Sequence, residues 1–563
     1  MNTMDGSIKK RTGKLRIAAA SLLLAIGVAV LAGCAKEPME GERPSSAQTV
    51  EPPATSSPPI KQAGYEVDEQ PGTVYYEIFV RSFYDSDGDG TGDLKGVTAK
   101  LDYLKELGIG GIWLMPIQAS PSYHGYDTTD YYAINPDYGK MDDLKELLSE
   151  AHDRGIKIIM DLVVNHTSAE HPWFIDAIDN PDSPYRSWYH IVNGDEKVLM
   201  DGAAGSGSPP WHARGDSKYL GIFWGGMPDL NFDEPAVREE MIRIGQFWLE
   251  QGLDGFRLDA AKHIYGDFTS TIYTPEVTAA NQAWWQQFRD GLSEVKPDAY
   301  LVGEVWDSVS VIAPFLDRAL SSAFHFDLSD RIMAAAKNER DSDFAFSLGR
   351  SHKLFEQASS GAYIDAPFLS NHDDNRVMTV LDGHVPHAKM AAAILLTMPG
   401  NPFIYYGEEI GMKGAKPDEY IREPMIWYSD SNGGEGQTTW ESSRHNAEAG
   451  AVSVEAQLRD ENSLLEHYRK LIKWRNEEPA LRDGVIAEYA LAESNSKVSL
   501  YIRATAEERV LVVHNLSSEP QVLELAESPI YGRFGELLYT TADGANLENS
   551  ELNMPPFSTV IVK

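Results

Sequence analysis

The sequence predicts an α/β protein: a closed (β/α)8 barrel of the TIM type, a loop-rich domain inserted after the third strand, and a C-terminal antiparallel β domain. Eight short apolar runs follow one another from Val74 onward, and most are separated by segments with the period of an amphipathic helix. Repeating strand–helix units predict a parallel sheet, and eight of them predict a closed barrel. Near Asp483 the helical pattern gives way to alternating strands.

Residues 1–33 have the pattern of an export signal. Basic residues precede the apolar run "IAAASLLLAIGVAVLAG", which is short for a membrane span. The only cysteine, Cys34, closes "LAGC". This tetrapeptide resembles a bacterial lipobox, so we expect Cys34 to be acylated and to become the mature N-terminus. An ordinary signal peptide with a chance cysteine is the alternative.

Residues 34–70 are rich in Pro, Ser, Thr and Glu and lack apolar periodicity. Such a composition cannot bury a core and predicts a disordered tether. We therefore expect an exported protein, lipid-anchored through Cys34 to the outer face of a bacterial cell membrane or released from it.

The barrel is expected in two parts, residues 71–166 and 232–482. Its strand-like runs are, in order, "VYYEIFV", "IGGIWLMP", "IKIIMDLVVNH", "LDGFRLDA", "AYLVGEVW", "SSAFHFDL", "APFLSNHD" and "NPFIYYGEE". Residues 167–231, with "GAAGSGSPP" and many aromatics, break this rhythm and predict an inserted domain B over the C-terminal mouth of the barrel. Runs such as "KVSLYIRA" and "RVLVVHN" predict a β-sandwich domain over 483–563.

The composition suits a folded protein and argues against one class of partner. The formal net charge is -36, so the surface repels phosphate backbones and we expect no nucleic-acid partner. The 12 tryptophans and 26 tyrosines suit either a core or a carbohydrate cleft. We expect a monomer whose only membrane contact is its lipid anchor.

Polar side chains gather at the ends of the predicted strands, and the strand ends of such a barrel line its active site. From strands three, four, five and seven they are Asp161, Asn165, His166, Arg257, Asp259, Glu304, His372, Asp373 and Asp374. Converging carboxylates are costly to bury unless they are used, although a structural ion-pair network is the alternative. Without a nucleotide loop, a cysteine nucleophile or a Ser-His-Asp signature, paired carboxylates indicate glycoside hydrolysis.

Four motifs resemble the conserved regions of the α-amylase family, glycoside hydrolase family 13. They are "DLVVNH" (161–166), "GFRLDAAKH" (255–263), "GEVW" (303–306) and "FLSNHDDNR" (368–376), and they stand in the family's order. The resemblance covers about residues 71–563. It implies that Asp259 is the nucleophile, Glu304 the general acid/base and Asp373 the carboxylate that stabilises and distorts the sugar ring. It also implies retention through a covalent glycosyl-enzyme, with the two reacting carboxylates about 5–5.5 Å apart.

The same resemblance implies a set of sugar contacts. Arg257 would orient Asp259, while His166 and His372 would hydrogen-bond the hydroxyls of the sugar at the cleaved bond. "HGYDTTDY" (124–131) resembles the family segment after strand two, which makes Tyr126 a stacking platform. The other implied substrate contacts are His124, Asp127, Lys262, His263 and Arg422.

Finer motifs bear on the choice of substrate. Lys262 and His263, after the predicted nucleophile, resemble enzymes that act on α-1,4-linked glucans. "MPDLN" (227–231) resembles a bacterial α-amylase group intermediate between oligo-1,6-glucosidases and neopullulanases. Neopullulanases and cyclomaltodextrinases usually carry an extra N-terminal β domain, whereas here we expect only a tether before the barrel. We therefore expect an endo-acting α-amylase whose partners are starch and maltooligosaccharides.

Two alternatives stay open. The first is another enzyme of the same chemistry: neopullulanase-like, cyclomaltodextrinase-like, maltogenic or glucan-transferring. A transferring enzyme forms the same glycosyl-enzyme and differs in whether water or a sugar hydroxyl attacks it. A non-catalytic surface glucan-binding lipoprotein belongs to another class. Such a relative should lack one or more of the three carboxylates, and this sequence has all three.

The loop "DSDGDGTGDLKG" (85–96) follows the first predicted strand. It resembles an EF-hand loop, but Gly96 replaces the bidentate Glu of the twelfth position, and a strand precedes it. A similar loop in oligo-1,6-glucosidase-like members binds Ca²⁺, and this resemblance implies ligands from Asp85, Asp87, Asp89 and Asp93 and the backbone carbonyl of Thr91. A charged turn without a cation is the alternative, although packed aspartates would then repel one another.

A second Ca²⁺ is implied between the inserted domain and the barrel. Its ligands would be Asn165, Asp229 and the main chain of His263. Simple hydrogen bonding of Asn165 is the alternative.

Overall fold

The computed structural model describes residues 72–563 apart from 199–208, 267–273, 431–432, 448–449, 451 and 492. The predicted export signal, Cys34 and the tether lie outside the described residues. Within these described residues, every helix is too short or too polar to cross a membrane.

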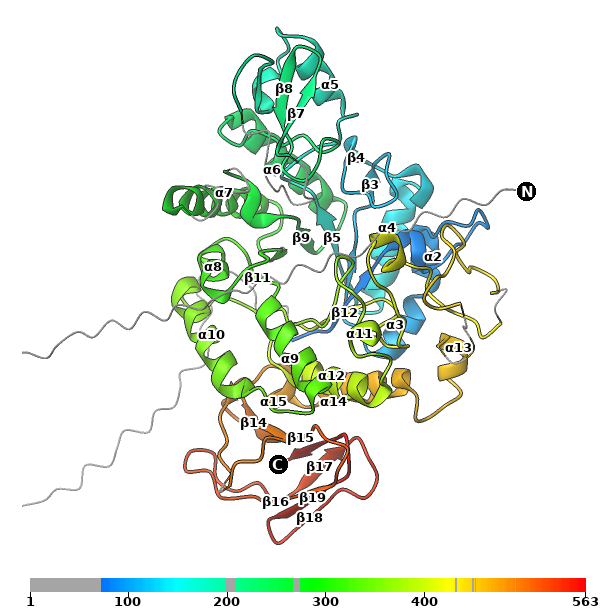
Figure 1. Cartoon of the computed structure of the whole chain (residues 1–563), viewed down its shortest axis with the longest axis vertical. Coiled ribbons are helices and arrows are strands. Elements are labelled where there is room, and N and C mark those ends of the chain that lie inside the picture. Colours follow the sequence, from blue (N-terminus) through cyan, green and yellow to red (C-terminus); the bar gives the residue numbers. More distant parts are fainter. Residues whose placement is uncertain are drawn as a thin grey trace, which may run out of the picture. The chain divides into compact units, whose positions relative to one another are not determined.

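A curled parallel sheet stands at the centre of the described chain (Figure 1). Seven of its strands, in the described residues, pair in the order β11-β10-β9-β5-β2-β1-β12. Their bounds are β1 Tyr75–Ile78, β2 Gly111–Leu114, β5 Lys157–Leu162, β9 Gly255–Leu258, β10 Tyr300–Gly303, β11 Ser322–Ala323 and β12 Phe403–Tyr405. The seventh predicted strand closes the ring through two parallel bridges, Phe324 with Ala366 and Phe368 with Phe403. The prediction of an eight-stranded barrel is confirmed.

Helices follow the strands and cover the outside of the barrel (Figure 1). The main ones are α2 Leu94–Ala99, α3 Leu101–Leu107, α4 Met141–Asp153, α6 Pro235–Glu250, α7 Pro275–Ser293, α9 Phe326–Asn338, α10 Phe344–Ser359, α12 Val385–Thr397 and α14 Leu464–Glu477. Shorter ones are α1 Val80–Phe83, α8 Val309–Ile312, α11 Val377–Val380, α13 Val454–Gln457 and α15 Pro479–Arg482. In α4, Leu144, Leu147 and Ala151 form the buried stripe that a helical period of 3.6 requires.

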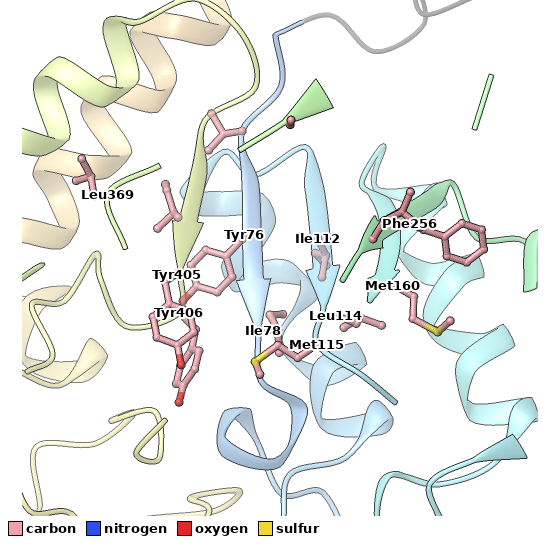
Figure 2. Close-up of a cluster of buried hydrophobic side chains, with 14 of the residues drawn as sticks. Tyr76, Ile78, Ile112, Leu114, Met115, Met160, Phe256, Leu369, Tyr405 and Tyr406 are labelled. Atoms are coloured by element: carbon pink, nitrogen blue, oxygen red, sulfur yellow. The ribbon is translucent and has the colours of Figure 1, made fainter. Parts of the chain in front are cut away.

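Alternation along the strands creates two cores. Tyr76, Ile112 and Met160 belong to the large cluster that includes the covering helices (Figure 2). Tyr75 and Trp113, one position away in their strands, belong to a separate cluster inside the barrel. Successive side chains of a strand point to opposite faces, so these two sets mark its outer and inner faces. Full burial of each such apolar side chain stabilises the fold by about 1.5–3 kcal/mol.

The chain between β5 and α6 forms a small unit of its own. It contains α5 Pro172–Asp179 and an antiparallel sheet in the order β6-β8-β7, with bounds β6 Ile191–Asn193, β7 Trp211–Arg214 and β8 Ser217–Leu220. A second hairpin, β3 Gln118–Ala119 with β4 Asp130–Ile134, follows β2.

The C-terminal part is antiparallel, as predicted. One sheet has the order β13-β14-β15-β20-β17, with bounds β13 Val485–Ala487, β14 Val498–Ala504, β15 Arg509–Asn515, β17 Leu537–Thr540 and β20 Ser558–Val562. The other has the order β16-β19-β18, with bounds β16 Gln521–Glu524, β18 Asn546–Glu548 and β19 Glu551–Met554. Buried Tyr501 on β14 lies 2.7 Å, hydroxyl to hydroxyl, from Thr397 of α12, so this part is joined to the barrel.

Candidate active site

The inner face of the barrel turns from apolar to charged at the carboxyl ends of its strands. Tyr75 faces the interior, and two residues further along β1 stands buried Glu77. In β5, Ile159 faces the interior, and two residues further stands buried Asp161. A period of two therefore carries these carboxylates inward at the same end of the sheet.

Arg257 of β9 joins three carboxylates. Its Nη1 lies 2.6 Å from Asp259 Oδ1 and 2.9 Å from Asp161 Oδ1. Its Nη2 lies 3.0 Å from Glu304 Oε2. The guanidinium is buried, and charge-assisted bonds of this kind fix both geometry and ionisation. The predicted nucleophile and the predicted acid/base thus share one cation.

Burial and charge act against each other on the two predicted reacting carboxylates. Burial raises the pKa of both Asp259 and Glu304, while Arg257 opposes the shift at each. Their side chains are 12% and 13% exposed, so a ligand can reach them. Glu304 Oε2 also accepts a hydrogen bond from the Ala260 N–H at 3.0 Å. A carboxyl group with a raised pKa can hold the proton that a general acid donates.

His372 bridges two carboxylates. Its Nδ1 lies 2.6 Å from Glu77 Oε1 and its Nε2 lies 3.1 Å from Asp373 Oδ2. Burial alone would lower the pKa of His372, but Asp373 and Glu77 raise it to about 10. The raised pKa favours the imidazolium form, and Nε2 also lies 2.6 Å from the Tyr126 hydroxyl.

Asp373 lies between two cations. Arg422 Nη2 donates to its Oδ1 at 2.9 Å, opposite the His372 contact. Burial would raise the pKa of Asp373, but His372 and Arg422 hold it well below the usual range. Arg422 Nη2 also lies 3.3 Å from Asp418 Oδ2. Asp373 is thus ionised, and one carboxylate edge is fixed by Arg422.

Tyr126 lies against the same group of charges. Its ring stacks on the His372 ring with centroids 5.4 Å apart, and its hydroxyl donates to Asp161 Oδ2 at 2.9 Å. His166 Nε2 lies 3.0 Å from the Tyr126 carbonyl oxygen, and burial lowers the pKa of His166 to about 4. His124 stacks on Tyr126 with centroids 6.1 Å apart. The structure therefore brings Tyr126 together with His124, His166 and His372, three of the predicted sugar contacts.

The remaining predicted substrate contacts are engaged within the protein. Lys262 Nζ lies 2.7 Å from the Trp306 carbonyl oxygen and 2.8 Å from Asp307 Oδ2, so it holds the loop that follows Glu304. Asp127 Oδ1 accepts a hydrogen bond from Ser120 Oγ at 2.7 Å. The His263 ring packs edge-on against Phe223, and burial lowers the pKa of that histidine to about 3.

Three of the predicted calcium ligands converge. Carboxylate oxygens of Asp85, Asp87 and Asp89 lie within 4.8 Å of one another. Asp85 also accepts the Gly88 and Gly90 N–H groups, at 2.7 and 2.8 Å, which fixes the loop around it. Oxygen donors of this kind fit a hard divalent cation.

Asp93, the fourth predicted carboxylate ligand, has other partners in this structure. It stands at the N-cap of α2, where its Oδ1 accepts the Gly96 N–H at 2.8 Å, and its Oδ2 accepts the Ser86 N–H at 2.7 Å. It is not part of the cluster of Asp85, Asp87 and Asp89. The aspartate at position 93 satisfies the free amide groups of a helix start, which is a common use of this residue type. The Thr91 N–H donates to Asp89 Oδ1 at 2.7 Å.

The second predicted calcium site has a different arrangement. Asn165 Nδ2 donates to the His263 carbonyl oxygen at 2.6 Å, so two of the predicted ligands bind each other. The Asp229 carboxylate faces the Ile222 N–H at 3.3 Å. Simple hydrogen bonding of Asn165, the alternative named above, describes this contact.

Sequence reasoning assigned no role to Glu77 or Asp418. The sequence predicts only a strand around Glu77, and its position two residues after Tyr75, on the inward face, is the one signal of a role in the site. Asp418 carries no motif and meets Arg422 one helical turn further along the chain.

Comparison with known proteins agrees with this geometry. Residues 77–484 match the family model described as the alpha amylase catalytic domain, and residues 498–561 match the Alpha-amylase SusG C-terminal domain. The chain is 43% identical to Alpha-amylase 3 of Dictyoglomus thermophilum over 504 residues, covering 89% of this chain and 95% of the relative. It is 35% identical to a 4-alpha-glucanotransferase of Thermotoga maritima, covering 80% of this chain and 97% of that one.

A solved structure, that of the alpha-amylase from H. orenii, superposes with a TM-score of 0.78 at 43% identity, covering 88% of this chain and 99% of that one. The chain therefore belongs to the alpha-amylase family of glycoside hydrolases.

Proposed function

We propose that this protein is a retaining α-glucan hydrolase that cleaves internal α-1,4-glucosidic bonds of starch and maltooligosaccharides. The observation that carries the proposal is the placement of Asp259 and Glu304 on the single guanidinium of Arg257. Two accessible carboxylates held in this way are the groups that glycoside hydrolysis requires. Similarity to proteins named alpha-amylase supports the choice of glucan.

The reaction takes two steps. Asp259 attacks the anomeric carbon while Glu304 gives its proton to the departing glucosidic oxygen, so that the C–O bond breaks and a glycosyl ester forms on Asp259. Glu304, now a carboxylate, takes a proton from water as the water oxygen attacks the same carbon and releases Asp259. Inversion occurs twice, and the product keeps the α configuration.

The neighbouring groups supply charge and position. Asp373, ionised between His372 and Arg422, stabilises the positive charge that develops on the sugar ring. The imidazolium of His372 and the imidazole of His166 hydrogen-bond sugar hydroxyls, and Tyr126 offers its ring as a stacking surface. His124, Asp127, Lys262 and His263 line the approach.

The proposal is tested by incubating the soluble form that lacks residues 1–34 with starch and measuring new reducing ends. The Asp259→Asn variant serves as the inactive control. We expect release by the unaltered protein alone. Glucan binding without any release of reducing ends would overturn the enzyme and favour a non-catalytic surface glucan-binding protein.

A second candidate is a maltogenic, neopullulanase-like or cyclomaltodextrinase-like hydrolase or a 4-α-glucanotransferase. Similarity to the Thermotoga maritima 4-alpha-glucanotransferase favours the transferase. A product time course on maltooligosaccharides, amylose, pullulan and cyclodextrin separates these activities. Early mid-chain cleavage of amylose supports the endo-acting α-amylase, whereas preference for cyclodextrin or pullulan, or growth of longer chains, supports the second candidate.

We also propose that Ca²⁺ binds the cluster of Asp85, Asp87 and Asp89. Three carboxylates within 4.8 Å provide the oxygen donors that this cation prefers. A bound cation offsets the repulsion among them and holds the loop after β1 and α1. It serves structure and takes no part in bond cleavage.

For location, we propose a lipoprotein anchored through Cys34 to the outer face of a bacterial membrane, with a monomeric catalytic part. The support is the "LAGC" sequence after an apolar run. Labelled fatty acid should enter the unaltered protein and not a Cys34→Ala variant. Equal labelling of the two would contradict lipidation at this residue.

A further inference from the structure

A cavity on the outside of the barrel is lined by residues other than the catalytic carboxylates. It measures about 330 Å³ and is lined by α8, α9 and α10 and the residue before α9. Figure 1 shows these helices together on one side of the barrel. The volume lies in the lower part of the range of about 300–1,000 Å³ typical of small-molecule sites. It suits one or two sugar rings rather than a long chain.

One wall of the cavity is an exposed aromatic ring. Phe346 of α10 is 46% exposed, although a phenylalanine gains most from burial. One turn further along the helix, the Arg350 guanidinium lies 5.5 Å from the ring centroid and also lines the cavity. Flat apolar rings bind the C–H faces of sugars, and a neighbouring arginine supplies donors for hydroxyl oxygens.

The cavity carries both donors and acceptors that lack ion-pair partners. Among the described residues, Arg331, Arg350 and Asp327 form no ion pair. Arg331 and Asp327 lie one turn apart on α9. An unpaired carboxylate disfavours an anionic ligand, whereas the hydroxyl groups of a neutral sugar can donate to a carboxylate and accept from an arginine. This mixture favours an uncharged sugar over a phosphate or a carboxylate.

A fixed histidine contributes to the lining of the cavity. His325 is 2% exposed, and its Nδ1 lies 3.1 Å from both oxygens of Asp365. Asp365 in turn lies 2.8 Å from His352 Nε2. Because Asp365 holds one edge of the His325 ring, its orientation is set before a ligand arrives, which lowers the entropic cost of binding.

We propose that this cavity binds a short segment of α-glucan and so retains long chains on the protein. The choice of an α-glucan as the ligand rests on the proposed function, in which the substrate is an α-glucan. Val309, on the cavity wall, begins α8 shortly after Glu304, so the chain from 304 to 309 joins the two sites.

The test uses the full chain carrying Asp259→Asn, which stops turnover, in native gels that contain amylose. Adding Phe346→Ala or Arg350→Ala should weaken amylose binding by roughly three- to tenfold, because one stacking or one hydrogen-bonding contact is lost. The conservative Phe346→Trp should restore binding. Leu458→Ala, which removes another side chain that is 46% exposed, is the matched control and should not change it.

Two results would overturn the inference. One is amylose binding by Phe346→Ala equal to that of the Leu458→Ala control, with the same circular dichroism spectrum. The other is loss of amylose binding in Phe346→Ala together with an equal loss of maltotriose hydrolysis when Phe346→Ala is made in the active protein, which keeps Asp259. That result would indicate damage to the catalytic site. Binding at the cavity is measured without turnover. If the active protein, which keeps Asp259, released no reducing ends from starch, that result would therefore overturn the proposed function alone.

Discussion

His372 Nδ1 lies 2.6 Å from Glu77 Oε1, and both side chains are buried. The two residues are 295 positions apart in the sequence. They meet because β12 pairs with β1 on one side and with the seventh strand, at Phe368, on the other, and His372 follows that seventh strand. Glu77 is thus the carboxylate that binds Nδ1 of His372, the histidine predicted to contact the sugar. Asp373 and Glu77 together raise the pKa of His372, and His372 in turn lowers the pKa of Asp373.

Replacing Glu77 by glutamine should narrow the pH range of the protein on the alkaline side. The pKa of His372 is raised from 6.5 to about 10, so the stabilisation from its proton is complete below about 6.5 and is lost as pH rises through 10. Glu77→Gln removes one of the two anions that raise this pKa. The alkaline limbs of kcat/KM and of Tm should both move to lower pH, measured between pH 5 and 10. Identical limbs in the two proteins would show that Glu77 does not act through His372.

Replacing Glu304 by glutamine should lower kcat on amylose by about 10²–10⁴-fold, because the proton donor to the leaving oxygen is lost. Fluoride leaves without protonation, so the same variant should retain much more of its activity on α-maltosyl fluoride. Asp259→Asn is the matched control and should lose both activities, since it lacks the nucleophile. An equal loss on both substrates in Glu304→Gln would argue against the acid role.

Alanine at both Asp87 and Asp89 should remove the calcium dependence of thermal stability. In the unaltered protein, a chelator should lower Tm, because uncompensated carboxylates repel one another in the loop. In the double variant the chelator should have little effect, and kcat should change little in both proteins. Asp195→Ala, at another exposed turn aspartate, is the control. Equal chelator shifts in the unaltered protein and the double variant would contradict binding at this loop.

Glu408 should set part of the alkaline stability limit. Burial raises its pKa from 4.5 to about 8, and the Tyr468 hydroxyl donates to its Oε1 at 2.8 Å. Its contribution is therefore complete below about pH 4.5 and is lost as pH rises through 8. Glu408→Gln keeps an acceptor for Tyr468 and cannot ionise, so its Tm should fall less between pH 5 and 9 than that of the unaltered protein. Parallel Tm curves would refute this assignment.

Much of the fold was predictable because strand and helix periods differ. The apolar runs predict the barrel strands, and the polar residues that follow them predict the position of the active site at the carboxyl ends of those strands. Local chemistry was harder to predict. Asp93 has the spacing of a calcium ligand, yet a helix starts immediately after it and its carboxylate caps the free amides. Asn165 and His263 meet as hydrogen-bond partners, a contact that depends on tertiary distance and not on spacing.

Glu77 has a role in the site that its sequence context does not predict. A single glutamate in an apolar strand has no sequence signal for its partner, and only closure of the barrel brings His372 beside it. The cavity between α8, α9 and α10 was equally hidden, because helices that are separate in sequence form its walls.

The central claim is that Asp259 forms a covalent intermediate and that Glu304 acts on both sides of it. The anomeric configuration of the first product tests this most directly. Proton NMR of maltoheptaose hydrolysis, recorded faster than mutarotation, should show new reducing ends as the α anomer, followed by slow conversion to the equilibrium mixture. Initial formation of the β anomer would contradict the double displacement and, with it, the roles proposed for both carboxylates.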